Sequence, residues 1–518
     1  MEVLINPGMK RSCLIALFVL CIASCTKLET RVYDQVNNFW RTPDEIAAGV
    51  APAYSGLRNF APANDAYALN EGSTDEIICP VRGGDWADVG TWDQMWKHTW
   101  QPNHPFIFSG WNFIYGNSGL PRVNSIMQAV NSVSPRPLDY ASIVGELRAV
   151  RAFYHFVALD LFGSVPVVDS NGISVDNIKQ KKPTEVFAYI EKELKDILPV
   201  LTSEVNTKTY GRATQWFAQA LLAKLYLNSF VYTGTPRWNE CIAACDDILH
   251  SEKYSLEPDF FSNFKIANEG SKENIFVIPF DTKNNLNYFW LQVATLHYQS
   301  NETFGLDGGG ANGLCSTVEY YDLFDPGDVR RKMFLVGQQY KNQVVNPANM
   351  QYDAQSGLPL SFDPVITSFV NSDPSSRLLG ARCAKWEFNK EGGGLMSNDF
   401  AIFRLADIIL MKAEAEYRNG ESAKALATIN QKINGVSIRS RTGLPDFSVS
   451  EMTLDGLLKE RACELSWEGW RRNDLIRFGH FTDARIPEKT ASAPTRSLYP
   501  IPSTAIALNP NLKQNPGY

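Results

Sequence analysis

Histidine is scarce in this sequence, and its six histidines are widely scattered. No H-E-x-x-H and no G-x-S-x-G motif is present, so the chain lacks the signatures of a zinc protease and of a serine hydrolase. The cysteines at positions 79, 241, 245, 315, 383 and 463 form neither a C-x-x-C pair nor a cluster with zinc-ligand spacing. We therefore expect buried free thiols, no metal site and no cofactor.

Long basic runs are also missing, and the formal net charge is −7. Nucleic-acid binding needs clustered lysine and arginine to neutralise phosphates, so a nucleic-acid partner is not expected. Beyond the N-terminal segment, no apolar run reaches the ~20 residues that a membrane-spanning helix needs. Any attachment to a membrane must then be made by other means.

The N-terminal segment has the pattern of a bacterial lipoprotein signal. Lys10 and Arg11 precede an apolar run over 13–23 that is too short to cross the ~30 Å hydrocarbon core of a bilayer. The run ends in Ile-Ala-Ser before Cys25, which resembles the lipobox cut by lipoprotein peptidases. We predict a signal peptide over 1–24, started at Met1 or Met9, and a lipid anchor on Cys25. An ordinary secretory peptide with a chance cysteine is the alternative.

Apolar residues recur at helical spacing in several long segments, which predicts a mainly α fold. These segments are 147–161, 213–227 and 406–417. Alanines between the large residues allow neighbouring helices to approach closely. The mature chain is long enough for a large core.

Two segments resemble degenerate tetratricopeptide repeats, in which helices pack in pairs. In 410–429, Ala413, Gly420 and Ala425 occupy the small positions of such a repeat, so we expect Gly420 to end one helix and Glu421 to begin the next. The segment 222–249 repeats this arrangement with a longer turn at 233–236. We predict one domain over 25–518, made of a helical half (25–254), a loop-rich insert (255–400) with short strands such as 275–280, and a C-terminal helical half with an extended tail (401–518). A binding surface would be built on the insert.

Several motifs resemble one family, in the order in which the family has them. They are GELR (145–148), FGSVP (162–166), ALLAKLYL (220–227), RLADIILMKAEA (404–415), ER (460–461), EL (464–465), EG (468–469), DLIR (474–477), YPIP (499–502), NPNL (509–512) and QNPGY (514–518). The chain is similar in these segments to the SusD/RagB family of outer-membrane nutrient-binding lipoproteins. The resemblance implies a non-catalytic protein on the exterior of the outer membrane, which holds oligosaccharides for import by a SusC-like TonB-dependent transporter.

Tryptophans gather after a glycine-rich turn that contains Arg82, Asp85 and Trp86. Sugars stack their apolar faces on aromatic rings, while charged and amide groups bond their hydroxyls. Trp86 follows two glycines and is a candidate stacking residue. Trp92, Trp96 and Trp100 instead follow helical spacing, which favours a buried stripe.

In the family, ligand-contacting aromatics come from this early loop and from the later insert, where Trp290 and Tyr298 are the candidates. The predicted glycan-binding residues are therefore Arg82, Asp85, Trp86, Trp290 and Tyr298. A peptide- or glycopeptide-binding member of the same family is the close alternative.

A glycoside hydrolase is the more distant alternative, because Glu460, Glu464 and Glu468 share one helical face. Nearby arginines at 461, 471, 472 and 477 favour a structural ion-pair network over an acid–base pair. Gly308, Gly310 and Gly313 match G-x-G-x-x-G, but without a preceding strand we interpret them as a flexible loop. Asp325 and Asp328 could contribute to a calcium site, and a turn is the favoured interpretation.

Overall fold

A computed structural model describes residues 40–61, 65–137, 139–284 and 289–518. The predicted signal peptide and Cys25 lie outside these residues. The described chain is mainly helical with short two-stranded sheets, as predicted from the periodicity. None of its helices is both long enough and apolar enough to cross a membrane.

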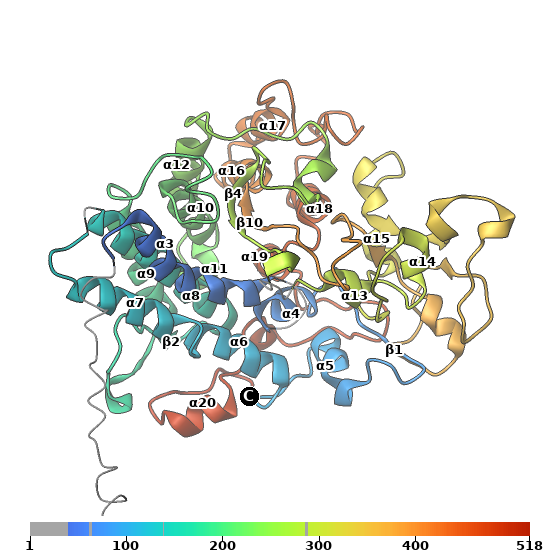
Figure 1. Cartoon of the computed structure of the whole chain (residues 1–518), viewed down its shortest axis with the longest axis horizontal. Coiled ribbons are helices and arrows are strands. Elements are labelled where there is room, and N and C mark those ends of the chain that lie inside the picture. The colour runs from blue at the N-terminus through green and yellow to red at the C-terminus, as the bar shows by residue number, and fades with distance from the viewer. Residues whose placement is uncertain (1–39, 62–64, 138, 285–288) are drawn as a thin grey trace, which may run out of the picture.

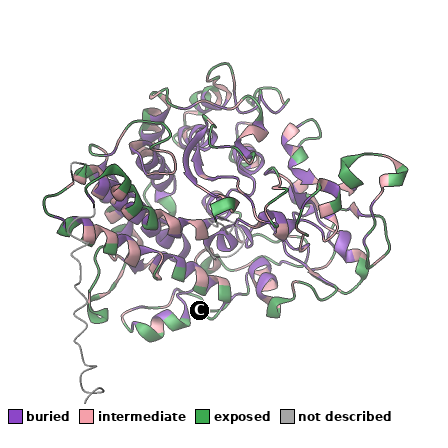
Figure 2. Cartoon of the chain, in the orientation of Figure 1, coloured by how far each residue is buried: buried purple, intermediate pink, exposed green. Residues whose placement is uncertain are grey.

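The N-terminal half is built from paired helices (Figure 1). Its elements are α3 (Pro43–Ser55), α4 (Asp65–Glu71), β1 (Val81–Arg82), α5 (Thr91–Lys97), α6 (Pro105–Tyr115), α7 (Leu120–Ser132), α8 (Tyr140–Phe162), β2 (Val165–Pro166), β3 (Gln180–Lys181), α9 (Pro183–Ile197), α10 (Gln215–Leu227), α11 (Ser229–Thr233) and α12 (Trp238–Leu249). Helix α8 is apolar on nearly all sides and is buried along most of its length (Figure 2). A helix of this kind must be surrounded, and α6, α7, α9 and α10 all pack on it.

The insert has little regular structure, and its elements are short (Figure 1). They are β4 (Asn274–Ile278), α13 (Leu291–Thr295), α14 (Ser300–Phe304), α15 (Val318–Tyr321), β5 (Phe334–Leu335), β6 (Gly337–Gln338), β7 (Ser361–Phe362), β8 (Val370–Asn371), β9 (Arg382–Cys383) and β10 (Phe400–Arg404). Strands β4 and β10 pair antiparallel, with Phe400 opposite Ile278, and fix the ends of the insert to each other.

The C-terminal half contains the clearest helix pair. Its helices are α16 (Leu405–Arg418), α17 (Ser422–Asn430), α18 (Leu454–Leu465), α19 (Arg471–Phe478) and α20 (Ser503–Leu508). Gly420 follows α16 with a φ of 83° and Glu421 caps α17, as predicted. The pair α10 and α12 is also present, although the short α11 occupies part of the turn between them. Helix α12 packs on α16 and thereby joins the two pairs.

Glu460, Glu464 and Glu468 belong to a buried ion-pair network, so the structural interpretation is confirmed. They do not share one helical face, because α18 ends at Leu465 and Glu468 lies in the turn that follows. Glu464 is fully buried and pairs with Arg441, Arg404 and Arg330 at 2.5, 2.6 and 3.0 Å. Glu460 also pairs with Arg330, and Glu468 pairs with Arg404. These carboxylates are saturated by cations and closed to solvent, which excludes them as an acid–base pair.

The arginines of this network differ from those that the sequence suggested. Arg461, Arg471, Arg472 and Arg477 were expected to surround the three glutamates, but each pairs with carboxylates on other elements. Their partners include Asp407 and Asp474 for Arg461, Asp75 for Arg471, Asp160 for Arg472 and Glu414 for Arg477. The partners of the three glutamates come from distant segments, and helical spacing alone cannot identify such contacts.

Candidate functional site

The loop after β1 carries the first group of predicted site residues. Strand β1 pairs in parallel with β8, so the loop at 82–90 lies beside the segment that follows Val370. Gly83 and Gly84 have positive φ, and the amide of Asp85 donates to the carbonyl of Arg82 at 3.1 Å. Asp85 is exposed in this tight turn, whereas Trp86 packs partly against the core. Trp86 itself has a φ of 63°, which is rare for a residue other than glycine, and such backbone strain is found mainly at functional sites.

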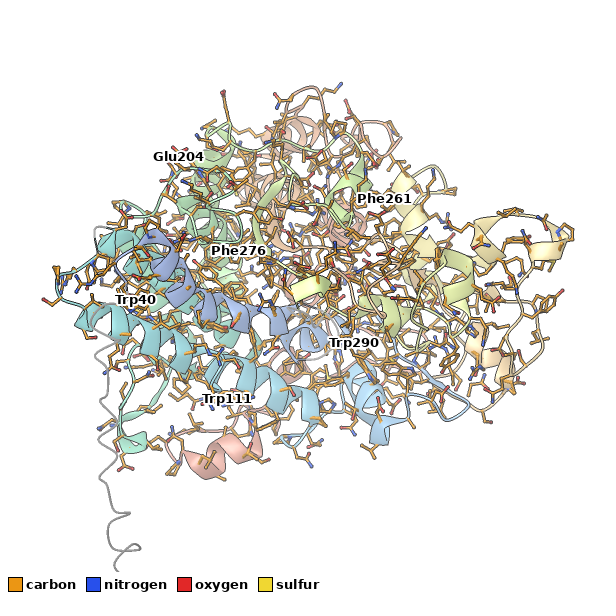
Figure 3. All side chains as sticks on the ribbon, viewed as in Figure 1. Trp40, Trp111, Glu204, Phe261, Phe276 and Trp290 are labelled. Atoms are coloured by element: carbon orange, nitrogen blue, oxygen red, sulfur yellow. The ribbon has the colours of Figure 1, made fainter. Side chains whose placement is uncertain are left out.

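Trp86 and Trp290 lie together, although they come from different halves of the sequence. Their ring centroids are 6.4 Å apart, and their planes are inclined by only 15°. Both rings are half-buried against the core. The Nε1 of Trp86 donates to the carbonyl of Ala311 at 2.6 Å. We call this pair the tryptophan platform; Figure 3 labels Trp290 on the ribbon beside the start of α13.

Asp85 and Tyr298 form the polar side of the same site. The Tyr298 hydroxyl donates to the Asp85 carboxylate, whose side chain is 48% exposed. Burial, together with the Asp85 charge, raises the pKa of Tyr298 to about 12, so the phenol keeps its proton. The exposed carboxylate oxygens can accept hydrogen bonds from ligand hydroxyls. Four of the five predicted residues therefore converge on one surface.

Arg377 contacts both residues of this polar side, and no sequence pattern identified it as a site residue. Its guanidinium lies 4.2 Å from the centre of the Tyr298 ring and pairs with Asp85 at 3.3 Å and with Asp353 at 3.2 Å. Burial and the charge of Arg382 lower the pKa of the neighbouring His297 to about 3, so this imidazole is neutral at physiological pH. Because the Arg377 guanidinium contacts both carboxylates and the ring, it holds the side chains of Asp85, Asp353 and Tyr298 in their orientations.

Arg82 does not lie on the accessible surface. Its side chain is buried, and its guanidinium donates to the carbonyls of Asn312, Gly313 and Leu379. Its predicted contact with a ligand is therefore corrected to an internal role. Arg382, which is also buried, donates to the same Leu379 carbonyl at 2.6 Å. Together these arginines fix the backbone beneath the platform.

The remaining tryptophans of the cluster belong to the core, as predicted. They do not form one helical stripe, because α5 ends at Lys97 and Trp100 lies beyond it. Trp96 and Trp100 are almost completely buried, and Trp92 is 5% exposed. Trp92 meets Trp86 edge to face at a centroid distance of 6.5 Å. Trp92 thus packs against the platform from the core.

The glycines at 308, 310 and 313 lie in irregular backbone, and a Cβ at any of them would meet another atom at less than 3.0 Å. A Cβ at Gly313 would lie 2.5 Å from carbons Cε2 and Cζ2 of the Trp86 indole and 3.0 Å from the Ala294 carbonyl. Only glycine allows this close approach. The position of Trp86 therefore depends on Gly313.

Gly313→Ala is expected to weaken ligand binding at least tenfold, because its methyl group would displace the Trp86 ring. Gly309→Ala on the same loop is the matched control, since its Cβ would meet only the Tyr298 carbonyl at an ordinary 3.7 Å. Tryptophan fluorescence and a binding titration would measure both effects. Equal behaviour of the two variants would show that Gly313 does not position the platform.

The described residues contain no group of three or more histidine, cysteine and acidic residues that could hold a metal ion. Asp328 caps a short helix through the amide of Arg330, and its own amide bonds to Asp325, so these aspartates shape a turn. All six cysteines in the described chain are buried and free, as predicted.

Glu71 and Glu76 are a buried pair of carboxyl groups, and such a pair can act as acid and base in an active site. Burial raises the pKa of Glu71 well above its ordinary value and that of Glu76 to about 7. Both side chains are only 1% exposed. Glu76 accepts from the amide of Trp467 and Glu71 from that of Arg471 at 3.4 Å. The pair thus holds the turn between α18 and α19 and is closed to a substrate.

Two cavities lie away from the platform. One of 520 Å³ has a mixed lining that includes Asp75, Arg471 and Arg485, and one of 280 Å³ has a mainly apolar lining that includes Leu159, Val231 and Leu498. Neither is lined by a platform residue. The platform is therefore distinct from both cavities.

Two family models match most of the chain. The model described as "SusD family" matches residues 272–518, and the one described as "Starch-binding associating with outer membrane" matches residues 62–227. The starch-binding protein SusD of Bacteroides thetaiotaomicron is 26% identical over 500 residues, which cover 87% of this chain and 85% of that protein.

Solved structures share the fold. A SusD superfamily protein from Parabacteroides distasonis aligns with a TM-score of 0.72 at 19% identity, covering 92% of this chain and 99% of the other. Surface glycan-binding protein A from Bacteroides thetaiotaomicron, solved with laminarihexaose, aligns with a TM-score of 0.71 at 21% identity, covering 91% and 99%. The predicted SusD-like fold is thereby confirmed. The chain belongs to the SusD/RagB family, and the glycan-binding proteins of this family are non-catalytic.

Proposed function

We propose that this protein captures oligosaccharides on the tryptophan platform and delivers them to a SusC-like TonB-dependent transporter in the outer membrane. The observation that carries the proposal is the meeting of Trp86 and Trp290 beside the Asp85–Tyr298 pair. Parallel aromatic rings next to an exposed carboxylate offer a sugar both stacking and hydrogen bonding. The family's general role in glycan binding agrees with this chemistry.

A neutral glucan is the first ligand to test. The curated relative is named as starch-binding, and the surface glycan-binding protein was solved with laminarihexaose; both ligands are glucose polymers. The test is a binding screen of the purified protein against starch, laminarin and a panel of other polysaccharides and peptides. Binding of a glycan that is lost in Trp290→Ala supports the proposal. Selective binding of peptides alone would favour the peptide-binding alternative.

The proposed attachment to the membrane depends on Cys25, which follows the predicted signal peptide. Several acyl chains on one cysteine hold a protein firmly at a bilayer, so Cys25→Ala should move the folded protein from the membrane fraction to the soluble fraction. Fractionation and immunoblotting measure this shift. A folded Cys25→Ala protein that stays in the membrane fraction would contradict the anchor.

The proposed transporter partner has a test of its own. Extraction of the unaltered protein with a mild detergent should recover the SusC-like barrel together with it.

A further inference from the structure

The cavity of 520 Å³ shares no residue with the tryptophan platform. Its lining comes from α15, α18, α19 and the loop that follows α19 (Figure 1). The volume lies within the ~300–1,000 Å³ that is usual for sites of small molecules. Several lining residues, among them Asp455 and His480, are exposed, so the cavity opens to solvent. A small ligand can therefore enter it.

Arg485 differs from the other basic residues of this cavity, because it forms no ion pair with any residue that the structure describes. The acidic neighbours of the others are Asp325 for Lys459, Asp75 for Arg471 and Asp483 for His480. The Arg485 guanidinium donates to the carbonyls of Ser73 at 2.7 Å and Phe481 at 2.6 Å, which engage two of its five N–H groups. Burial lowers the pKa of Arg485 to about 10, so the side chain remains a cation at neutral pH. An anion bound beside it would balance this charge.

Glu319 is the acidic counterpart of Arg485 in this cavity. It belongs to α15, and its side chain is exposed. The acidic lining residues Asp75, Asp455 and Asp483 each have a basic neighbour. Glu319 forms neither an ion pair nor a side-chain hydrogen bond within the described part of the chain. The cavity thus offers one unpaired cation and one unpaired anion, carried by different elements of the fold.

Aliphatic side chains complete the lining. Leu458 and Leu475 are buried, and Leu323 is half-buried. Ile486, next to Arg485 in the chain, is 60% exposed. Apolar side chains in a cavity can cover the hydrocarbon part of a ligand and remove it from water. The lining therefore suits a small molecule with an anionic group, a cationic group and an aliphatic part, and short aliphatic peptides and amino acids have all three.

We propose that this cavity binds small zwitterions of the peptide type, with the carboxylate at Arg485, the ammonium group at Glu319 and an aliphatic side chain on the leucines of the lining. The proposal goes beyond glycan capture and does not depend on it, because the cavity and the platform are separate. A ligand that carries both charges should bind more tightly than one that lacks either charge.

The test is a calorimetric titration of the whole protein with leucine, dileucine and trileucine, of which at least one should bind. The C-terminal amide of the best ligand lacks the carboxylate and should bind about tenfold more weakly. This amide tests Arg485 without altering the loop that its hydrogen bonds hold. The N-acetyl form lacks the ammonium group and should bind about three- to fivefold more weakly, because the contact with Glu319 is exposed to solvent. Glu319→Gln should weaken the zwitterion to the same extent and leave the N-acetyl form unchanged.

Glu204→Gln is the matched control, because Glu204 is an exposed glutamate that does not line the cavity; Figure 3 labels it at upper left. Trp290→Ala should leave binding of the zwitterion unchanged while it weakens glycan binding, which separates this proposal from the proposed function. Equal affinities for the free and the capped ligands would overturn the proposal. So would an equal response of Glu319→Gln and Glu204→Gln, or a protein that binds none of the three zwitterions.

Discussion

Replacing Glu464 by glutamine is expected to lower the free energy of unfolding by about 3–5 kcal/mol, since breaking a buried ion pair leaves unbalanced charge in the core. Glu464 is completely buried and is the common partner of Arg330, Arg404 and Arg441. Burial alone would raise the pKa of its carboxyl group, but the three guanidinium charges outweigh burial and hold the pKa well below its ordinary value. Urea unfolding followed by circular dichroism would measure the change.

The carboxyl group of Glu464 is also expected to make the free energy of unfolding decrease as the pH falls. A carboxyl whose pKa is lower in the folded protein stabilises the fold above its unfolded pKa, near 4.5, and loses that contribution as the pH falls. Glu464→Gln should therefore lose less stability between pH 6 and pH 3 than the unaltered protein does. Glu302→Gln is the control, because Glu302 and Lys341 form an exposed pair at 2.7 Å, for which we expect less than about 1 kcal/mol. Equal destabilisation by the two variants would contradict the central role of the buried network.

Trp96 and Trp290 are expected to respond in opposite ways to replacement by alanine. Trp96 is 1% exposed, and its Nε1 donates to the Pro487 carbonyl at 2.7 Å. Trp96→Ala should therefore cost about 3–5 kcal/mol of stability through the cavity it leaves. Trp290 is half-buried at the surface, so Trp290→Ala should change the melting temperature little and weaken glycan binding by about 1–3 kcal/mol. Thermal melts and titrations on the same preparations separate the two effects.

Trp86 is a less suitable residue for this comparison than its sequence context suggests. Its position after two glycines made it a candidate stacking residue. In the structure it bonds to Ala311, meets Trp92 edge to face and leaves no room for a side chain at Gly313. Trp86→Ala would thus disturb both binding and packing. Trp290 makes the cleaner test of the platform.

Local patterns predicted the helices well, because apolar residues recur every three or four positions along the buried face of a helix. The apolar periodicity located α8, α10 and α16, and Gly420 marked the break before α17. The spacing of tryptophans likewise separated the buried Trp92, Trp96 and Trp100 from Trp86. In each case the signal is a spacing of residues that repeats within a few turns of the chain.

The parts that could not be predicted depend on contacts between distant segments. Nothing in the pattern around Arg377 shows that β1 and β8 pair and bring it to Asp85. Arg82 was assigned to the ligand because charged side chains form hydrogen bonds with the hydroxyls of sugars. Its burial follows from the carbonyls at 312, 313 and 379, which are supplied by other loops. To predict the contacts of either arginine, one would have to know which distant segments lie side by side.

The most direct measurement is a calorimetric titration of the unaltered protein and of Trp290→Ala with the polysaccharide that binds in the screen, starting with starch and laminarin. Platform binding predicts measurable affinity in the unaltered protein and at least a tenfold loss in Trp290→Ala, with melting temperatures that agree within a few degrees. Equal affinities in the two proteins would contradict glycan capture at Trp86 and Trp290.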